Sequence, residues 1–213
     1  MIAAACLFFT ANVGFAEEWQ SLFNGADLKG WRANFDAESF QVVDGVLRVQ
    51  ASGTKSAHLF FMGDRKDGFE RFKDFELEAT VRAEPSSNGG IFVHCDEELR
   101  DAARHLAKGY EIQLNSTDKE ARKTGSLYAV VDRTESPVKE TEWFKVHVLV
   151  QGKRIVIKLN GETVVDYTEP DNVERPPMRA GRRFSADGGA IALQAHDHGS
   201  VWYFKEIRVK RLP

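Results

Sequence analysis

Cysteine is almost absent from this chain of 213 residues, which contains only Cys6 and Cys95. Cys6 lies in the apolar segment that begins the chain, so the remainder has one cysteine and cannot form an internal disulfide. The fold must therefore be stabilised by a hydrophobic core, for which 15 Phe and 4 Trp supply large side chains. No repeat, linker or second domain is visible, and we expect a single domain over residues 17–213.

A hydrophobic run long enough to cross a bilayer is also missing. Residues 2–16 are apolar and uncharged, but they are too few to span a membrane and they end at Ala16, before the acidic Glu17. This pattern predicts a signal peptide over residues 1–16, with export to the periplasm or the extracellular space and no membrane partner for the mature chain. The usual basic start is missing, which indicates a truncated beginning. A lipid-modified Cys6 is less favoured, because the apolar run continues beyond it.

Neither sign of charge is in marked excess, since 29 basic residues face 32 acidic ones and the formal net charge is -3. The densest basic cluster, which contains Arg179, Arg182 and Arg183, lies in a Pro- and Gly-containing loop without an aromatic platform for bases. We interpret it as a solvated loop and expect no nucleic-acid partner.

Short alternating segments separated by turn residues make up most of the remaining sequence. Strands are predicted over residues 40–49, 75–83, 90–95, 110–114, 126–131, 143–150, 155–159, 163–167, 190–195 and 201–209. Asn160-Gly161 predicts a type I′ hairpin and Gln151-Gly152 a second tight connection, so residues 143–167 should form an antiparallel meander. The pattern predicts an all-β fold of two antiparallel sheets, a β-sandwich or jelly roll.

Two segments interrupt this pattern. Residues 96–108 have apolar side chains at helical spacing and are followed by Gly109, which predicts a helix that could act as a wall or lid. A loop packed on the sandwich edge is the simpler alternative for this segment. The loop over residues 168–189 is too long to be only a turn and could form a second wall.

Two of the predicted strands gather polar side chains on one face. Side chains of a strand alternate with a period of two, so residues 110–114 and the residue after them separate apolar from polar positions. The polar positions are Glu111, Gln113 and Asn115. In the strand at residues 190–195, the same alternation puts Gln194 beside His196. A carboxylate, amides and an imidazole form a polar floor suited to the hydroxyl groups of a sugar, so we expect a carbohydrate ligand.

Short motifs occur in order along nearly the whole chain after the predicted signal. They are W-Q-S-L-F-N-G-A-D-L-K-G-W (19–31), F-Q-V-V-D-G-V-L (40–47), F-E-L (75–77), S-N-G-G-I-F (87–92), G-Y-E-I-Q (109–113), T-G-S-L-Y (124–128), I-A-L-Q-A-H-D (191–197) and the closing Y-F with Ile207. Together they resemble the family of 3-keto-disaccharide hydrolase domains. The resemblance implies a concanavalin-like jelly roll, export from a bacterial cell, and action on 3-keto-glycosides or a related sugar.

Some positions depart from the family pattern. Asn88-Gly89-Gly90 stands where N-S-G is usual, His94 stands where an arginine is common, and F-K-E-I replaces F-R-N-I near the end. An imidazole differs from a guanidinium in charge, reach and hydrogen-bond geometry, so the change at His94 could alter the ligand or the activity.

The polar face lacks the pair of carboxylates with which ordinary glycosidases work, about 5–5.5 Å apart in retaining enzymes. Asp96 is the nearest candidate for a second acid, which makes an ordinary glucanase unfavoured. A ketone at C3 would acidify the C2 proton and allow the glycosidic oxygen to leave C1 by elimination. We then expect Glu111 or His196 to act as the base and the other to protonate the leaving group. The residues expected to orient the sugar or stabilise the enolate are Asn88, His94, Gln113 and Gln194.

Three further expectations concern a metal and the aromatic residues. No cofactor is indicated with certainty, but His94, Glu111 and His196 could hold a divalent cation that polarises the ketone, although no H-E-x-x-H or C-x-x-C motif supports it. The Tyr128 hydroxyl could donate to the ketone, and an exposed Trp143 ring could stack on the sugar.

Cys95 should be buried and inert on the apolar side of its strand, with Ile91 and Val93. The competing interpretation of the whole polar face is a carbohydrate-binding, lectin-like module without catalysis, because such sites also use carboxylates to bind hydroxyl groups.

Overall fold

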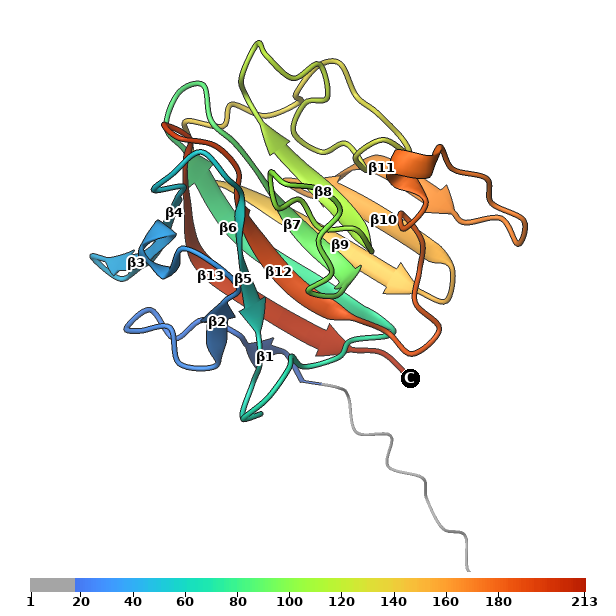
Figure 1. Cartoon of the computed structure of the whole chain (residues 1–213), viewed down its shortest axis with the longest axis horizontal. Helices are drawn as coiled ribbons and strands as arrows, with labels where there is room; N and C mark the ends of the chain where they lie inside the picture. The colour runs from blue at the N-terminus through green and yellow to red at the C-terminus, as the bar shows by residue number, and fades with distance from the viewer. Residues whose placement is uncertain (1–17) are drawn as a thin grey trace, which may run out of the picture.

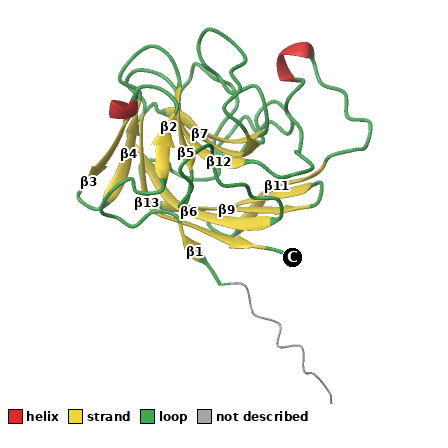
Figure 2. Ribbon diagram, turned by 60° about the horizontal axis from the view of Figure 1, so that its bottom comes forward, coloured by secondary structure: helices red, strands yellow, loops and turns green. Residues whose placement is uncertain are grey.

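The computed structural model describes residues 18–213, so the signal peptide predicted over residues 1–16 lies outside the described part of the chain. Strands dominate residues 18–213, where the helical residues are two short 3-10 turns, η1 (Ala37–Ser39) and η2 (Pro177–Arg179). No helix in this range is long and apolar enough to cross a membrane. The strands form two antiparallel sheets (Figure 1, Figure 2), which confirms the predicted all-β sandwich.

The two sheets differ in size. The eight-stranded sheet runs β11 (Glu162–Thr168), β10 (Arg154–Leu159), β9 (Phe144–Gln151), β6 (Phe75–Ala83), β13 (Val201–Arg211), β4 (Val46–Gln50), β3 (Phe40–Val43), and β1 (Gln20–Ser21) also pairs with β13. The five-stranded sheet runs β2 (Trp31–Ala33), β5 (Ala57–Phe61), β12 (Ala190–Ala195), β7 (Asn88–Cys95), β8 (Tyr110–Asn115).

The hydrophobic core lies between the sheets. From the larger sheet it includes Val146 and Val148, and from the smaller sheet Ile112 and Leu193, all at most 1% exposed. Each such side chain contributes about 1.5–3 kcal/mol when it is removed from water. Because alternate residues of β7, β8 and β12 are committed to this core, the residues between them point to the outer face of the five-stranded sheet.

The predicted meander is confirmed by β9, β10 and β11. Asn160 and Gly161 both have positive φ, 49° and 87°, as a type I′ turn requires, and Gly152 turns the preceding hairpin with φ 58°. The strand predicted over residues 40–49 is instead a hairpin of β3 and β4, because Asp44 and the glycine after it adopt positive φ.

One predicted strand is wrong, and the sequence pattern missed several others. Residues 126–131 form a turn in which Leu127 makes isolated bridges to Ile112 and Val131, and Ala129 has φ 59°. The missed strands are β1, β2 and β5; β5 is buried along its whole length, so it shows no alternation of polar and apolar residues.

The helix predicted over residues 96–108 is wrong, and the alternative given for this segment, a loop, is confirmed. Oδ1 of Asp101 accepts hydrogen bonds from the backbone N–H groups of Ala103 and His105, at 3.1 and 3.3 Å, which competes with helical bonding. Leu99 and Leu106 pair in an antiparallel bridge instead of sharing a helix face.

A β-bulge in β7 changes which side chains face the core. His94 has φ 52°, and the register against β12 shifts at this point. Cys95 therefore packs with Phe92 on the outer side of the sheet, not with Ile91 and Val93, so its predicted side is wrong. Its predicted burial is confirmed, since it is 1% exposed and burial raises the pKa of its thiol.

Gly109 is required where the loop enters β8. It has φ +83°, and an added Cβ would lie 2.6 Å from both the Cys95 nitrogen and the Val93 oxygen. We expect Gly109→Ala to reduce the free energy of unfolding by more than the roughly 1–3 kcal/mol of a left-handed non-glycine residue, because the backbone must also move.

Urea unfolding would measure this loss, with Gly152→Ala as the matched control. Gly152 also has positive φ, but a Cβ there meets nothing within 4 Å. Equal losses for the two variants would contradict the close contact at Gly109.

Candidate functional site

A cavity of about 230 Å³ lies on the outer face of the five-stranded sheet. Its floor comes from β7, β8 and β12 and consists of Asn88, Phe92, Glu111, Gln113 and Gln194, with His196 just after β12. Its walls come from three loops and contribute Arg100, His105, Glu120, Tyr128, Arg179 and Arg182. Both interrupting segments, residues 96–108 and 168–189, thus supply walls, as expected, although neither wall is an α-helix.

The floor contains a row of side chains set by strand register. Gly90 of β7 pairs with Gln113 on one side and Gln194 on the other, so the two amides are separated by a residue without a side chain. Gln113 Nε2 donates to Asn88 Oδ1 at 3.2 Å, and Gln194 Nε2 lies 3.3 Å from His58 Nε2. Burial lowers the pKa of His58 to about 3, which keeps this contact neutral. The Glu111 side chain packs over Gly90, since a Cβ added there would lie 3.1 Å from both Cγ and Oε1 of Glu111.

Glu111 forms a buried ion pair with Arg182. Arg182 Nη2 donates to Glu111 Oε2 at 3.0 Å and Nη1 donates to the Gly109 carbonyl at 3.2 Å, and the two side chains are 2% and 6% exposed. Burial raises the pKa of Glu111, which Arg182 opposes, and burial lowers the pKa of Arg182. The interpretation of this arginine cluster as solvated is therefore wrong at Arg182.

Two histidine rings lie next to each other in the lining of the cavity. The ring centroids of His105 and His196 are 5.5 Å apart. His105 Nδ1 lies 2.9 Å from Asp101 Oδ2, and His196 Nδ1 lies 3.6 Å from Asp197 Oδ2, too far for a hydrogen bond but close enough for charge attraction. The pKa of Asp197 is lowered, chiefly by His196. Both imidazoles line the cavity, which places two proton-transfer groups beside one ligand site.

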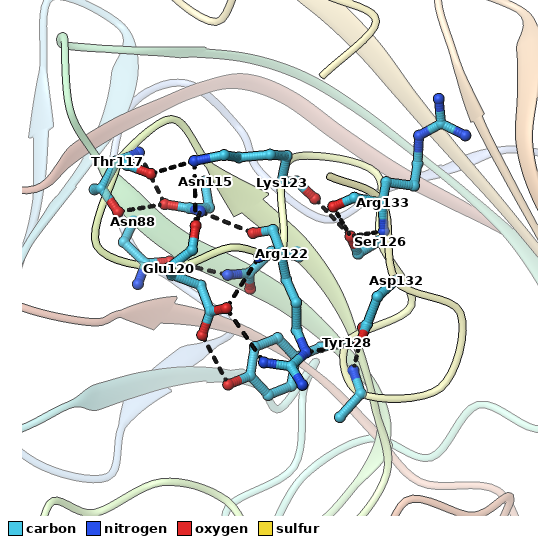
Figure 3. Close-up of polar contacts among 12 residues, drawn as sticks. Asn88, Asn115, Thr117, Glu120, Arg122, Lys123, Ser126, Tyr128, Asp132 and Arg133 are labelled. Atoms are coloured by element: carbon cyan, nitrogen blue, oxygen red, sulfur yellow. Dashed lines mark hydrogen bonds and ion pairs between the residues drawn. The ribbon is translucent and has the colours of Figure 1, made fainter. Parts of the chain in front are cut away.

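Tyr128 lies in the wall, as its predicted role requires. Its hydroxyl donates to Glu120 Oε2 at 3.1 Å (Figure 3), and Arg179 Nη2 donates to the same hydroxyl at 3.3 Å. Burial and the nearby Glu120 raise the pKa of Tyr128. The phenol is therefore held in its neutral form, and its one proton is donated to Glu120.

Asn115 shares the polar face but serves the loop that follows β8. Its Nδ2 donates to the carbonyls of Glu120 and Arg122 at 2.9 and 2.8 Å, and its Oδ1 accepts from the Thr117 backbone (Figure 3). These bonds hold the loop that carries Glu120 to the cavity.

The structure does not bring His94 to the cavity. The bulge turns it away, and its Nε2 lies 2.8 Å from the Lys73 carbonyl while Nδ1 accepts from the Ser185 backbone. Burial lowers its pKa. It lines a second cavity of about 510 Å³, which Asp96 also lines, so the candidate second acid is likewise outside the first cavity.

The predicted metal set is not assembled either. His94 lies apart from Glu111 and His196, and residues 18–213 contain no group of three His, Cys, Asp or Glu side chains arranged to hold a metal ion. The expectation that these three could jointly coordinate a cation is therefore wrong.

Trp143 lies outside the cavity, immediately before β9 of the eight-stranded sheet. The residue is 38% exposed, as predicted, but Lys205 Nζ lies 4.6 Å and the Arg82 guanidinium carbon 5.5 Å from the ring centroid. Cations rather than a cavity surround this ring.

Sequence reasoning missed most of the wall. The missed wall residues are Arg100, His105, Glu120, Arg179 and Arg182, and Asp101, which contacts His105 behind the wall, was missed with them. They come from loops, where no periodicity indicates which side chains face inward. The clustered arginines and the D-x-x-x-H spacing of Asp101 and His105 were the available signals.

Comparisons with known proteins point to one family. A family model described as the 3-keto-alpha-glucoside-1,2-lyase-like domain matches residues 18–210. A 3-keto-disaccharide hydrolase of Bacteroides thetaiotaomicron is 25% identical over 234 aligned positions, which cover 92% of this chain and 79% of that protein.

Solved structures share the fold. A Parabacteroides distasonis protein described as a glycosyl hydrolase superposes with a TM-score of 0.72 at 23% identity, covering 92% of this chain and 94% of the other. The carbohydrate-binding module CBM66 of Bacillus subtilis superposes with a TM-score of 0.57 at 12% identity, covering 85% and 95%. At these identities the likeness establishes the jelly-roll architecture alone.

Proposed function

This chain belongs to the family of 3-keto-alpha-glucoside-1,2-lyase-like domains, and from that premise we propose that it is an exported enzyme that cleaves 3-keto-glycosides or closely related sugars. The hydrolase name of the Bacteroides thetaiotaomicron relative supports the substrate class, and the apolar start of the sequence supports export. The reaction takes place in the 230 Å³ cavity on the five-stranded sheet.

Buried polar atoms without partners are the observation that supports a sugar in this cavity. In the described chain they include Gln113 Oε1, Gln194 Oε1, Arg179 Nη1, Arg182 Nε and His196 Nδ1, all on lining residues. Leaving such an atom unsatisfied costs about 1–3 kcal/mol, so a ligand rich in hydroxyl and carbonyl oxygens gains by filling the space. The cavity is smaller than the roughly 300–1,000 Å³ of drug-sized sites, which suits one sugar ring.

The ketone at C3 of the proposed substrate determines how the glycosidic bond is cleaved. A base takes the C2 proton, and the electron pair of that bond moves toward C3 so that the ketone oxygen becomes an enolate. When the C1–O bond breaks, the enolate electrons form the C1–C2 double bond and restore the ketone, while the leaving oxygen takes a proton from an acid. In hydrolysis, water then adds at C1 and C2 regains a proton. This route needs one base and one acid, not the two carboxylates of an ordinary glycosidase.

The two residues predicted to move protons differ in their surroundings. His196 was predicted to be either the base or the acid; it lines the cavity and its Nδ1 makes no hydrogen bond, and we assign it the role of the acid. Glu111 is held by Arg182 at 3.0 Å, and we assign it to fixing that cation beside the ketone. Gln113, Gln194 and Asn88 orient the sugar hydroxyls.

Reducing-sugar release by the full chain would test the function, with 3-keto-trehalose as the substrate and trehalose as the matched control. We expect release from the 3-keto-sugar alone, because only its C2 proton is acidified. A repeat with a chelator tests a cation, whose removal would abolish turnover if one polarises the ketone. Tight sugar binding without any turnover would overturn the enzyme and leave a binding module.

A carbohydrate-binding module is the second candidate function. It is favoured by the shared fold with CBM66 and by the engagement of the floor carboxylate in an ion pair. The histidines favour the enzyme, because hydroxyl binding alone does not require two facing imidazoles.

A further inference from the structure

His105 and Asp101 form an imidazole–carboxylate pair in the cavity wall that the function proposed above leaves unused. The Nδ1 atom of His105 lies 3.0 and 2.9 Å from the two Asp101 oxygens. The carboxylate is fixed from other sides too, because Arg100 Nε donates to Oδ2 at 3.0 Å and the Ala103 backbone donates to Oδ1 at 3.1 Å. The pair is therefore a rigid unit.

The charge of Asp101 sets the tautomer of His105. Partial burial raises the pKa of Asp101, but hydrogen bonds from the side chain and backbone of His105 outweigh it and hold the pKa at about 2. An ionised carboxylate only accepts hydrogen bonds, so Nδ1 carries the proton and a neutral His105 keeps its lone pair on Nε2. A lone pair on the nitrogen opposite the carboxylate is the form that a general base needs.

The groups around His105 leave this role open to it. Its ring faces His196 at 5.5 Å, and Arg100, Arg182 and Glu111 line the same cavity. Glu111 already accepts from Arg182 at 3.0 Å, and proton abstraction by Glu111 would leave Arg182 buried without its counter-charge. The side chain of His105 is 26% exposed, so a ligand in the cavity can reach it.

We propose that His105 is the base that removes the C2 proton, with Asp101 as a positioning residue that fixes its orientation and tautomer. This assignment rests on the proposed function. The C2–H bond breaks, its proton goes to Nε2 of His105, and its electron pair passes to the enolate. As the C1–O bond breaks, His196 donates a proton to the leaving oxygen, and the electron pair of that bond stays with this oxygen. The enolate electrons then form the C1–C2 double bond and restore the ketone.

The test compares full-chain variants on 3-keto-trehalose that carries deuterium at C2. We expect His105→Gln to lower kcat and the release of label into water together, about 10²- to 10⁴-fold, with KM within a few-fold of the wild type. Added imidazole should restore part of the activity of His105→Ala. Asp101→Asn should lower kcat about 10-fold or more without a matching change in KM.

His147→Gln is the matched control. His147 Nε2 also lies 2.9 Å from a carboxylate, that of Glu76, but it belongs to the eight-stranded sheet and does not line the cavity. We expect it to keep the wild-type kcat. Melting temperatures report whether each variant is folded.

Three results would overturn the assignment. The first is a His105→Gln variant that cleaves and releases label as the wild type does. The second is a loss in both His105 variants that follows a lowered melting temperature and that imidazole does not restore, because it indicates a structural role. The third is a wild type that cleaves without releasing label. A wild type that neither cleaves nor releases label instead overturns the proposed function, and the assignment with it.

Discussion

Replacing His196 with glutamine should lower kcat for 3-keto-trehalose about 10²- to 10⁴-fold while the protein stays folded. His196 follows β12, its side chain is 29% exposed, and its Nδ1 makes no hydrogen bond, so the fold does not depend on it. Without an acid, the leaving sugar must depart as an alkoxide. The loss should shrink with a nitrophenyl 3-keto-glucoside, because nitrophenolate leaves without a proton.

The decisive quantity is the ratio between the loss of kcat that His196→Gln causes on 3-keto-trehalose and the loss that it causes on the nitrophenyl 3-keto-glucoside. His198→Gln is the control, since His198 is exposed two residues further along the chain and does not line the cavity. An equal loss on both substrates would show that His196 does not protonate the leaving group.

Breaking the buried pair should have the largest effect on stability. Glu111→Gln leaves Arg182 charged and buried, which costs about 3–5 kcal/mol in the free energy of unfolding. Arg182→Met should cost less at acidic pH, because Glu111 can then take a proton. The variant with both substitutions should lose less free energy of unfolding than the two single variants together, because it contains no buried charge without a partner.

The pH dependence of Arg182→Met has a definite sign. Burial raises the pKa of Glu111 in the folded state above 4.5, and in this variant the opposing arginine is gone. The folded state then binds more protons than the unfolded state between 4.5 and the raised pKa, so stability is greatest below 4.5 and falls as the pH rises through that window. Urea unfolding across this range would measure it. Stability that rises with pH in this variant would contradict the buried state of Glu111.

The alternation of strands explains why much of the floor could be predicted. A period of two assigns Glu111 and Gln113 to the face opposite Ile112 without any knowledge of the partner strands, and the structure keeps that assignment. The same rule fails at His94, because one residue with φ 52° inverts the order of faces and leaves no mark in the apolar spacing.

The walls could not be predicted, for two physical reasons. Leu99 and Leu106 have the spacing of a helix face, yet the Asp101 carboxylate takes the backbone N–H groups that a helix would use. Arginine in a loop with Pro and Gly is ordinarily solvated, and burial of Arg182 is tolerable because it donates to Glu111 and to the Gly109 carbonyl. The first outcome depends on a local competition between a side chain and the helix backbone, and the second on a contact between segments that are distant in the sequence.

The attachment of Arg182 to the floor limits how a substrate can enter. The loop over residues 168–189 carries this arginine. Movement of the loop away from the sheet would therefore break the ion pair and leave the Glu111 carboxylate buried without a counter-charge. Opening of the loop and loss of the site are then one cooperative event. This event is a local unfolding and not a rigid hinge motion of the loop. A ligand must then enter the cavity while the loop stays in place, and the rate at which a protease cleaves this loop would report on whether the site is intact.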